Sequence, residues 1–181
     1  MERHPSRIRQ LTLLSVLTAS CLASQVLPRP PNLEFTSLIT FVTGVVAGGF
    51  AGAMLGGLVM FVNGFLSPYG FAGIIMPLQM LGMALIGFSG GLFTKLGNGS
   101  VVRLYVEVAV IGAFLTIIYD AITTIGFAIM YSVPLVPTLI TGVAFSFIHI
   151  VYNTVLFGLL AVPLSYAMQK IYLPKKETLA S

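Results

Sequence analysis

The chain has 181 residues, of which 57% are apolar and 8% charged, and its formal net charge is +4. A soluble domain would carry about 25% charged residues, so this composition excludes an ordinary soluble enzyme. No Asp, Glu, Lys or Arg occurs over residues 35–94 or 121–169. Uncharged apolar runs of this length indicate membrane-spanning helices. We therefore expect a single integral membrane domain over residues 1–181.

The chain begins with a basic segment and an apolar run that predicts a helix over residues 8–27. A basic start, an apolar core and small residues also fit a signal peptide, cleaved so that residues 1–24 are lost. The run is long enough to span a bilayer, and we favour a retained first helix. Ala19 and Ala23 share one face of this helix, where their small side chains let another helix approach closely, either within the chain or from a partner.

Residues 28–34 contain three prolines, which predict a stiff loop that carries Asn32 and Glu34. The uncharged residues 35–66 would be about 48 Å long as one helix, against a hydrocarbon core of about 30 Å. We break this run near Gly48 and Gly49 into helices over residues 35–48 and 50–66. Glycines recur there at every fourth position from 44 to 56, which predicts very close helix packing.

Three further helices are predicted over residues 74–94, 101–131 and 138–172, the last with a kink at Pro163. With six spans and a cytoplasmic N-terminus, eight of the nine basic residues lie on the cytoplasmic side, as the positive-inside rule requires. The expected fold is an all-α membrane protein, a six-transmembrane-helix bundle in the cell membrane, with both termini cytoplasmic.

Polar side chains inside a bilayer are costly and often functional. Counted at 1.5 Å per residue from the cytoplasmic ends, four helices place polar residues about 20–31 Å up, in the outer part of the membrane. This common level predicts an outward-facing pocket. The candidate binding residues are Asn32, Glu34, Asn63, Tyr69, Gln79, Asp120, His149, Tyr152 and Asn153.

Structural roles for these residues stay open. Asp120 can simply pair with His149, Asn63 can end a helix, and Gln79 can satisfy backbone groups that Pro77 frees. The single cysteine, Cys21, excludes an internal disulfide and an all-cysteine metal site, and we expect no metal centre.

The pattern resembles the substrate-binding S component of an energy-coupling factor (ECF) vitamin transporter. The Ala19-x-x-x-Ala23 pair matches the family's Ala-x-x-x-Ala on its first helix, and residues 31–35 are similar to its first outer loop. Residues 77–80 and 85–92 look most like the cobalamin-specific members, although Leu78 stands where a tryptophan is common. His149 and Asn153 match a sixth helix in the same members.

The resemblance implies a vitamin receptor with no catalytic residues and no permanently bound cofactor. Cobalamin is the favoured ligand, ahead of riboflavin, thiamine or a queuosine precursor, and His149 is a candidate axial ligand of its cobalt. The first outer loop would act as a lid. The implied partners are a transmembrane T subunit, which docks on Ala19 and Ala23, and two ATPase subunits, which alone use ATP. No nucleic-acid partner is implied.

Three other classes of protein remain as alternatives. A membrane-embedded hydrolase would combine His149 and Asp120 with a serine or threonine, but no Gly-x-Ser-x-Gly or His-Glu-x-x-His motif occurs. A self-sufficient channel or carrier would need charges through the whole membrane depth. A structural membrane subunit would pair its polar residues among themselves and leave no cavity.

Overall fold

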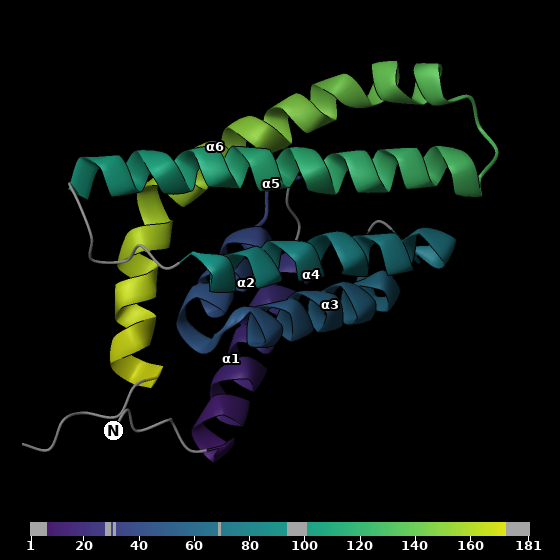
Figure 1. The fold of residues 1–181 in the computed structure, drawn as a ribbon. Helices are drawn as coiled ribbons and strands as arrows, with labels where there is room; N and C mark the ends of the chain where they lie inside the picture. The colour runs from purple at the N-terminus through teal and green to yellow at the C-terminus, as the bar shows by residue number, and fades with distance from the viewer. Residues whose placement is uncertain (1–6, 28–29, 31, 69, 94–100, 173–181) are drawn as a thin grey trace, which may run out of the picture.

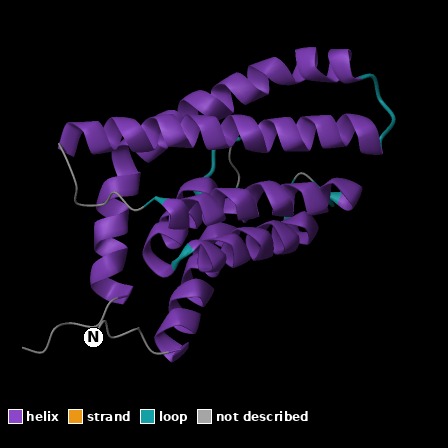
Figure 2. Cartoon of the chain, in the orientation of Figure 1, coloured by secondary structure: helices purple, strands orange, loops and turns teal. Residues whose placement is uncertain are grey.

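The computed structural model describes residues 7–27, 30, 32–68, 70–93 and 101–172. These residues form helices joined by short connections, with no strand among them (Figure 2). The helices are α1 (Arg7–Val26), α2 (Thr36–Ala47), α3 (Gly49–Leu66), α4 (Met76–Leu92), α5 (Val101–Met130) and α6 (Leu135–Tyr172), with a 3₁₀ turn, η1 (Gly73–Ile75), leading into α4. The prediction of an all-α chain is confirmed.

Four helical segments within the described ranges are long and apolar enough to cross a membrane: α3, η1 with α4, α5 and α6. The apolar helix α2 has only 12 residues, a length of about 18 Å. The 20-residue helix α1 is not among the four, and it carries Arg7 and Arg9 in its first turn. The structure thus indicates a membrane protein, whereas six spans remain a prediction.

The long uncharged run breaks at the predicted glycines. Gly48 lies between α2 and α3 with a φ of 96°, a conformation that only glycine adopts without strain. The chain reverses there, and α2 packs against α3. This break converts a segment too long for one span into two helices.

The short helix α2 forms the centre of the fold. Eight of its residues are buried, and it contacts α1, α3, α4 and α6. Its apolar face carries Leu38, Phe41 and Val42, and Phe41 lies 5.3 Å between ring centroids from Phe157 on α6. Polar residues of α2 are buried as well, among them Thr36, Thr40 and Thr43, so the helix is enclosed by its neighbours on most of its circumference.

Close backbone contacts join α2, α3 and α4 into what we call the glycine layer. A methyl group added at Gly44 would overlap the carbonyl oxygen of Gly87, and one at Gly90 would overlap that of Phe41. Gly52 on α3 likewise faces Gly87 on α4. Small residues at such spacing let helix backbones touch, so the predicted close packing is confirmed for these helices.

The two longest helices, α5 and α6, lie against each other above α4 (Figure 1). Helix α6 has 38 residues, about 57 Å if straight. Figure 1 shows it bending strongly in its C-terminal half, the part that contains Pro163. The predicted kink therefore lies in the bent region, and a proline that removes a helical hydrogen bond provides its cause.

Helix α6 begins at Leu135 rather than at residue 138, so its predicted start was wrong. Pro137 falls in the first turn, where backbone amides have no partner within the helix. A proline there removes no hydrogen bond. The Val-Pro-Leu-Val-Pro segment, interpreted from sequence as a turn, is thus partly helical.

Candidate functional site

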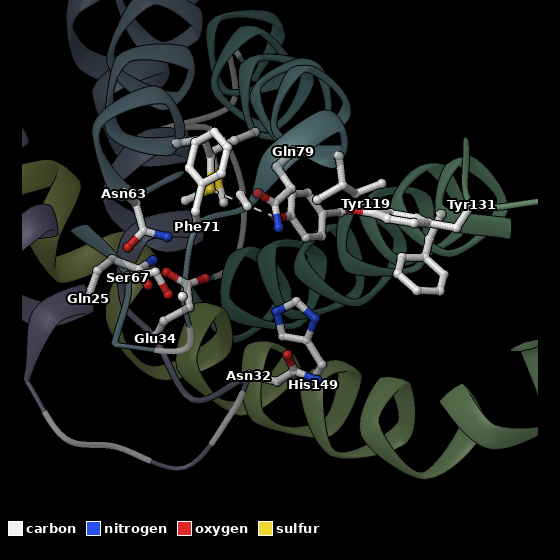
Figure 3. Close-up of a pocket in the computed structure, with 16 residues that line it drawn as sticks. Gln25, Asn32, Glu34, Asn63, Ser67, Phe71, Gln79, Tyr119, Tyr131 and His149 are labelled. Atoms are coloured by element: carbon white, nitrogen blue, oxygen red, sulfur yellow. Dashed lines mark hydrogen bonds between the residues drawn. The ribbon is translucent and has the colours of Figure 1, made fainter. Parts of the chain in front are cut away.

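A polar cavity of about 380 Å³ opens between the glycine layer and the α5–α6 pair (Figure 3). Small-molecule sites usually have volumes of about 300–1,000 Å³, so this cavity suits a small ligand. Every α-helix except α2 contributes at least one lining residue. The described lining residues are Gln25, Asn32, Glu34, Met60, Asn63, Ser67, Gly70, Phe71, Ala72, Ile75, Gln79, Met83, Tyr119, Phe127, Tyr131 and His149.

The connection between α1 and α2 forms one wall of the cavity. Asn32 has a φ of 65°, a left-handed conformation that asparagine adopts more readily than most residues. Its Nδ2 donates a hydrogen bond to the carbonyl oxygen of Phe145 on α6 at 3.1 Å. This bond joins Asn32 to α6, so the described end of the connection, with Asn32 and Glu34, lies at the cavity.

Glu34 lines the cavity, but its carboxylate caps the start of α2. The carboxylate oxygens accept hydrogen bonds from the amides of Thr36 and Ser37, and from the Ser37 hydroxyl at 2.6 Å. The first amides of a helix have no partner within the helix, and the helix dipole favours negative charge there. These hydrogen bonds therefore hold the Glu34 carboxylate in one position at the cavity wall.

The turn between α3 and α4 supplies another part of the wall. Gly70 has a φ of 100°, which allows the tight reversal, and the amide of Ala72 donates back to the carbonyl oxygen of Gly64 at 2.9 Å. This turn brings Phe71 to the cavity beside Asn63 (Figure 3). The Oδ1 atom of Asn63 is buried and has no hydrogen-bond partner within the described structure.

Aromatic rings form much of the remaining surface. Tyr119 on α5 donates its hydroxyl hydrogen bond to the sulfur of Met60 at 3.8 Å. Phe127 and Tyr131 lie 4.7 Å apart between ring centroids. Gln79 is the polar lining residue on α4 and points between these rings and Asn63 (Figure 3). The cavity thus combines aromatic faces with a few polar groups, as sites for aromatic ligands commonly do.

His149 connects the cavity to a buried carboxylate. Its Nδ1 lies 2.8 Å from Oδ1 of Asp120 on α5. A carboxylate can only accept a hydrogen bond, so Nδ1 carries a proton. The other ring nitrogen, Nε2, is buried without a hydrogen-bond partner among the described residues. In the neutral imidazole this nitrogen is an acceptor, and it belongs to a residue that lines the cavity.

The structure gathers five of the nine candidate binding residues around the cavity: Asn32, Glu34, Asn63, Gln79 and His149. Three others do not line it. Asp120 lies behind His149, Tyr152 packs edge-on against Phe35, and Asn153 donates from Nδ2 to the Thr116 hydroxyl at 3.0 Å. Adjacent or one-turn positions on a helix point in different directions, so these three residues lie off this cavity wall, and their role in binding stays a prediction. Tyr69 lies outside the described residues.

Sequence reasoning did not identify Gln25 or Phe71 as lining residues, and it chose Asp120 over its neighbour Tyr119, which lines the cavity. Gln25 is buried near the end of α1 and donates from Nε2 to the Thr36 hydroxyl at 2.8 Å. A glutamine inside an apolar run was a signal that could have been read. For Tyr119 and Phe71, aromatic residues in apolar segments carry no comparable signal.

A second cavity of about 440 Å³ adjoins the first, since both are lined by Ile75, Gln79 and Phe127. Its remaining wall is formed by the C-terminal part of α5 and the first turns of α6, with four threonines among the lining residues. A ligand too large for the polar cavity would extend in this direction. Within the described ranges, no three His, Cys, Asp or Glu residues cluster to hold a metal ion.

The fold and the cavity define a class: an all-helical chain with candidate membrane spans and an internal polar site. No family model, curated protein or solved structure matches this chain. The function must therefore be argued from the site itself.

Proposed function

We propose that this protein is the vitamin-binding S component of an ECF-type importer, in which it captures a small molecule from outside the cell membrane. The observation that carries the proposal is the polar cavity, where side chains from α3, α4, α5 and α6 meet the α1–α2 connection. A receptor needs such a pre-formed site, with polar groups placed among apolar and aromatic walls to orient the ligand. No ATP site is needed in this chain, because partner ATPases would supply the energy.

The proposed topology has six spans with both termini cytoplasmic. It is supported by the placement of basic residues. The start of α1 and the end of α6 also lie toward the same side of the molecule, in the lower part of Figure 1. Labelling of single cysteines introduced at either end, in intact cells and in lysed cells, tests this arrangement.

The proposed T-subunit docking surface is the face of α1 that carries Ala19 and Ala23. Both residues are exposed, so neither is used for packing within the chain. Small side chains on an exposed helix face allow a partner helix to approach to backbone distance. This supports a docking role over internal packing, the alternative left open by the sequence.

The resemblance favours cobalamin as the ligand, with riboflavin, thiamine or a queuosine precursor as alternatives. An intact cobalamin is several times larger than a cavity of about 380 Å³, so its binding would require the second cavity and movement of the α1–α2 connection. His149 Nε2 has no hydrogen-bond partner among the described residues, and in the neutral ring this nitrogen offers the lone pair that an axial cobalt ligand needs. The smaller vitamins require neither rearrangement.

The direct test is ligand binding by the purified protein in detergent or nanodiscs, without ATP. Native mass spectrometry should detect one copurified small molecule per chain, and titration with candidate vitamins should reproduce its binding. A protein that carries no small molecule and binds no vitamin, although folded by circular dichroism, would overturn the proposal.

The hydrolase alternative is less well supported. His149 and Asp120 form two members of a triad, but Nε2 has no serine or threonine hydroxyl within hydrogen-bond distance among the described residues. A nucleophile must lie within reach of its base. The pair is therefore better suited to hold an imidazole in one orientation for a bound ligand.

A further inference from the structure

We infer that the polar cavity takes a neutral or cationic heteroaromatic compound that carries N–H or O–H donors, and that it rejects phosphate esters and other anions. This inference rests on the proposed function, since it names the ligand chemistry of the same site. Three independent features of the cavity carry it: its charge, the orphaned nitrogen of His149 and its aromatic walls.

The formally charged side chains at the described cavity wall are carboxylates. Glu34 lines the cavity, and Asp120 lies directly behind His149. Among the described lining residues there is no lysine or arginine. An anionic ligand would lose its hydration and be repelled by a carboxylate, with no lysine or arginine among the described lining residues to offset the cost. Charge interactions are strong where water is excluded. A cationic ligand would gain from the same arrangement.

His149 sets the hydrogen-bonding polarity of the site. The residue is 5% exposed, and Asp120 fixes the proton on Nδ1 by accepting its hydrogen bond at 2.8 Å. The unpartnered Nε2 is then an acceptor in the neutral ring. A buried polar atom without a partner is unfavourable, so a ligand that donates an N–H or O–H to Nε2 is stabilised. A ligand that presents only hydrogen-bond acceptors to Nε2 gains no such stabilisation.

The walls suit a flat ring of modest size. Phe71, Tyr119, Phe127 and Tyr131 line the cavity, and aromatic faces attract both stacked rings and organic cations. A volume of about 380 Å³ accommodates one to three fused or linked rings but not a corrin macrocycle with its nucleotide loop. Size, charge and donor requirement therefore select the same class of compound.

Matched pairs of compounds that differ only by a phosphate test the charge requirement. We would titrate the purified protein with thiamine and thiamine monophosphate, riboflavin and flavin mononucleotide, and pyridoxine and pyridoxine 5′-phosphate, together with cyanocobalamin. For each ring that binds, the phosphorylated member is expected to bind at least about tenfold more weakly.

The outcomes separate this inference from the proposed function. If phosphorylated members bind as well as their partners, or if cyanocobalamin alone binds, the inference is overturned and the receptor function stands. If no compound binds and none copurifies, both are overturned. Arg29 lies outside the described residues, so Arg29→Gln is tested alongside; anion binding that disappears in this variant would locate the missing cation and also overturn the inference.

The donor requirement is tested by Asp120→Asn, which keeps the shape of the residue. The asparagine amide can donate to Nδ1, which moves the imidazole proton to Nε2 and turns the cavity-facing acceptor into a donor. The preferred ligand should then bind about tenfold more weakly. The ¹⁵N chemical shifts of the His149 ring should show the proton moving from Nδ1 to Nε2, a change that a purely structural role would not produce.

Glu107→Gln is the matched control, because Glu107 pairs with Arg103 at 2.8 Å on the exposed start of α5 and lines no part of the cavity. Its removal should leave affinity and the His149 resonances unchanged. Unchanged affinity in Asp120→Asn, with the tautomer reversed, would contradict the donor requirement. Should Asp120→Asn fail to fold, the matched pairs on the unaltered protein still decide the inference.

Discussion

The glycine layer and the α5–α6 pair are built on different kinds of contact. In the glycine layer, backbones touch: Gly44, Gly52 and Gly87 leave no room for a methyl group against neighbouring backbone atoms. Where α5 meets the rest of the molecule, side chains meet backbone instead, as where the Tyr119 ring covers Gly82 on α4 and Leu78 covers Gly126 on α5. Backbone contacts cannot adjust, whereas side chains can change rotamer.

This difference places a rigid surface opposite an adjustable one, with the polar cavity between them. Large apolar side chains on the first half of α6, such as Val143, Phe145 and Phe147, are exposed, as expected for a surface that faces lipid. Asn32 and Phe35 join this half of α6 to the α1–α2 connection, through a hydrogen bond to the Phe145 carbonyl oxygen and an edge-on contact with the Tyr152 ring. The comparison predicts that substitutions in the glycine layer disturb folding, whereas those around the cavity disturb binding.

The largest effect is expected for Gly87→Ala. The new methyl group would overlap backbone atoms of Gly52, which cannot move without separating α3 from α4. Overpacking of this kind should lower stability by about 3 kcal/mol or more, measured by thermal unfolding in detergent. Gly57→Ala is the control, because no atom lies within 4 Å of its added methyl, and alanine favours a helix by about 1 kcal/mol. Equal melting temperatures for the two variants would contradict the rigid layer.

A smaller loss of stability is expected for Asn153→Ala. Asn153 is fully buried, and its bond to Thr116 joins α6 to α5. Losing a buried hydrogen bond should cost about 1–3 kcal/mol in unfolding experiments, whereas ligand affinity in the folded fraction should change little because Asn153 does not line the cavity. In the control Thr154→Ala, the lost hydroxyl bonds only to its own helix. If Asn153→Ala lost ligand affinity and Thr154→Ala did not, Asn153 would be a binding residue, as the sequence predicted.

Gln79→Ala should weaken ligand binding without lowering the stability of the protein. The Gln79 side chain lines both cavities. Its loss should weaken ligand binding about tenfold, which corresponds to one hydrogen bond. The melting temperature of the ligand-free protein should stay close to that of the original. Ser89→Ala on the same helix is the control, since its hydroxyl bonds to the Leu85 carbonyl oxygen and lines neither cavity.

The smallest effect on the isolated protein is expected for Ala19→Leu and Ala23→Leu. Both positions are exposed, so stability and ligand affinity should be unchanged, while uptake by the proposed complex with a T subunit and ATPases should be lost. Ser20→Leu is the control, because Ser20 is also exposed and points about 100° away around the helix. If Ala19→Leu or Ala23→Leu abolished ligand binding, this face of α1 would be needed for the structure of the cavity. If uptake by these variants equalled that of Ser20→Leu, the proposed docking surface at Ala19 and Ala23 would be contradicted.

The helices were predictable because their signals are local. Long apolar runs define α3, α4, α5 and α6, and segments that contain proline, glycine or charged residues separate them. The break at Gly48 followed from length alone, since the run exceeds what one span requires. The early start of α6 was missed because Pro137 reads as a helix breaker unless its position in the first turn is known.

The cavity was predictable only in part. Counting residues along each helix places Asn63, Gln79 and His149 at one level, and the structure brings these three to one cavity. Depth along a helix does not give direction around it. Asp120, Tyr152 and Asn153 share that level but lie away from the cavity, because the packing angle of each helix decides which face turns inward.

The sequence by itself determined that this chain is helical and apolar and that the long uncharged run breaks at Gly48, since these properties depend on composition and spacing along the chain. Only the tertiary structure decided that Glu34 caps α2, that Asp120 holds His149 from behind, and that aromatic rings enclose the site. These contacts join residues far apart in sequence, and they arise when helices pack at angles that no local pattern encodes.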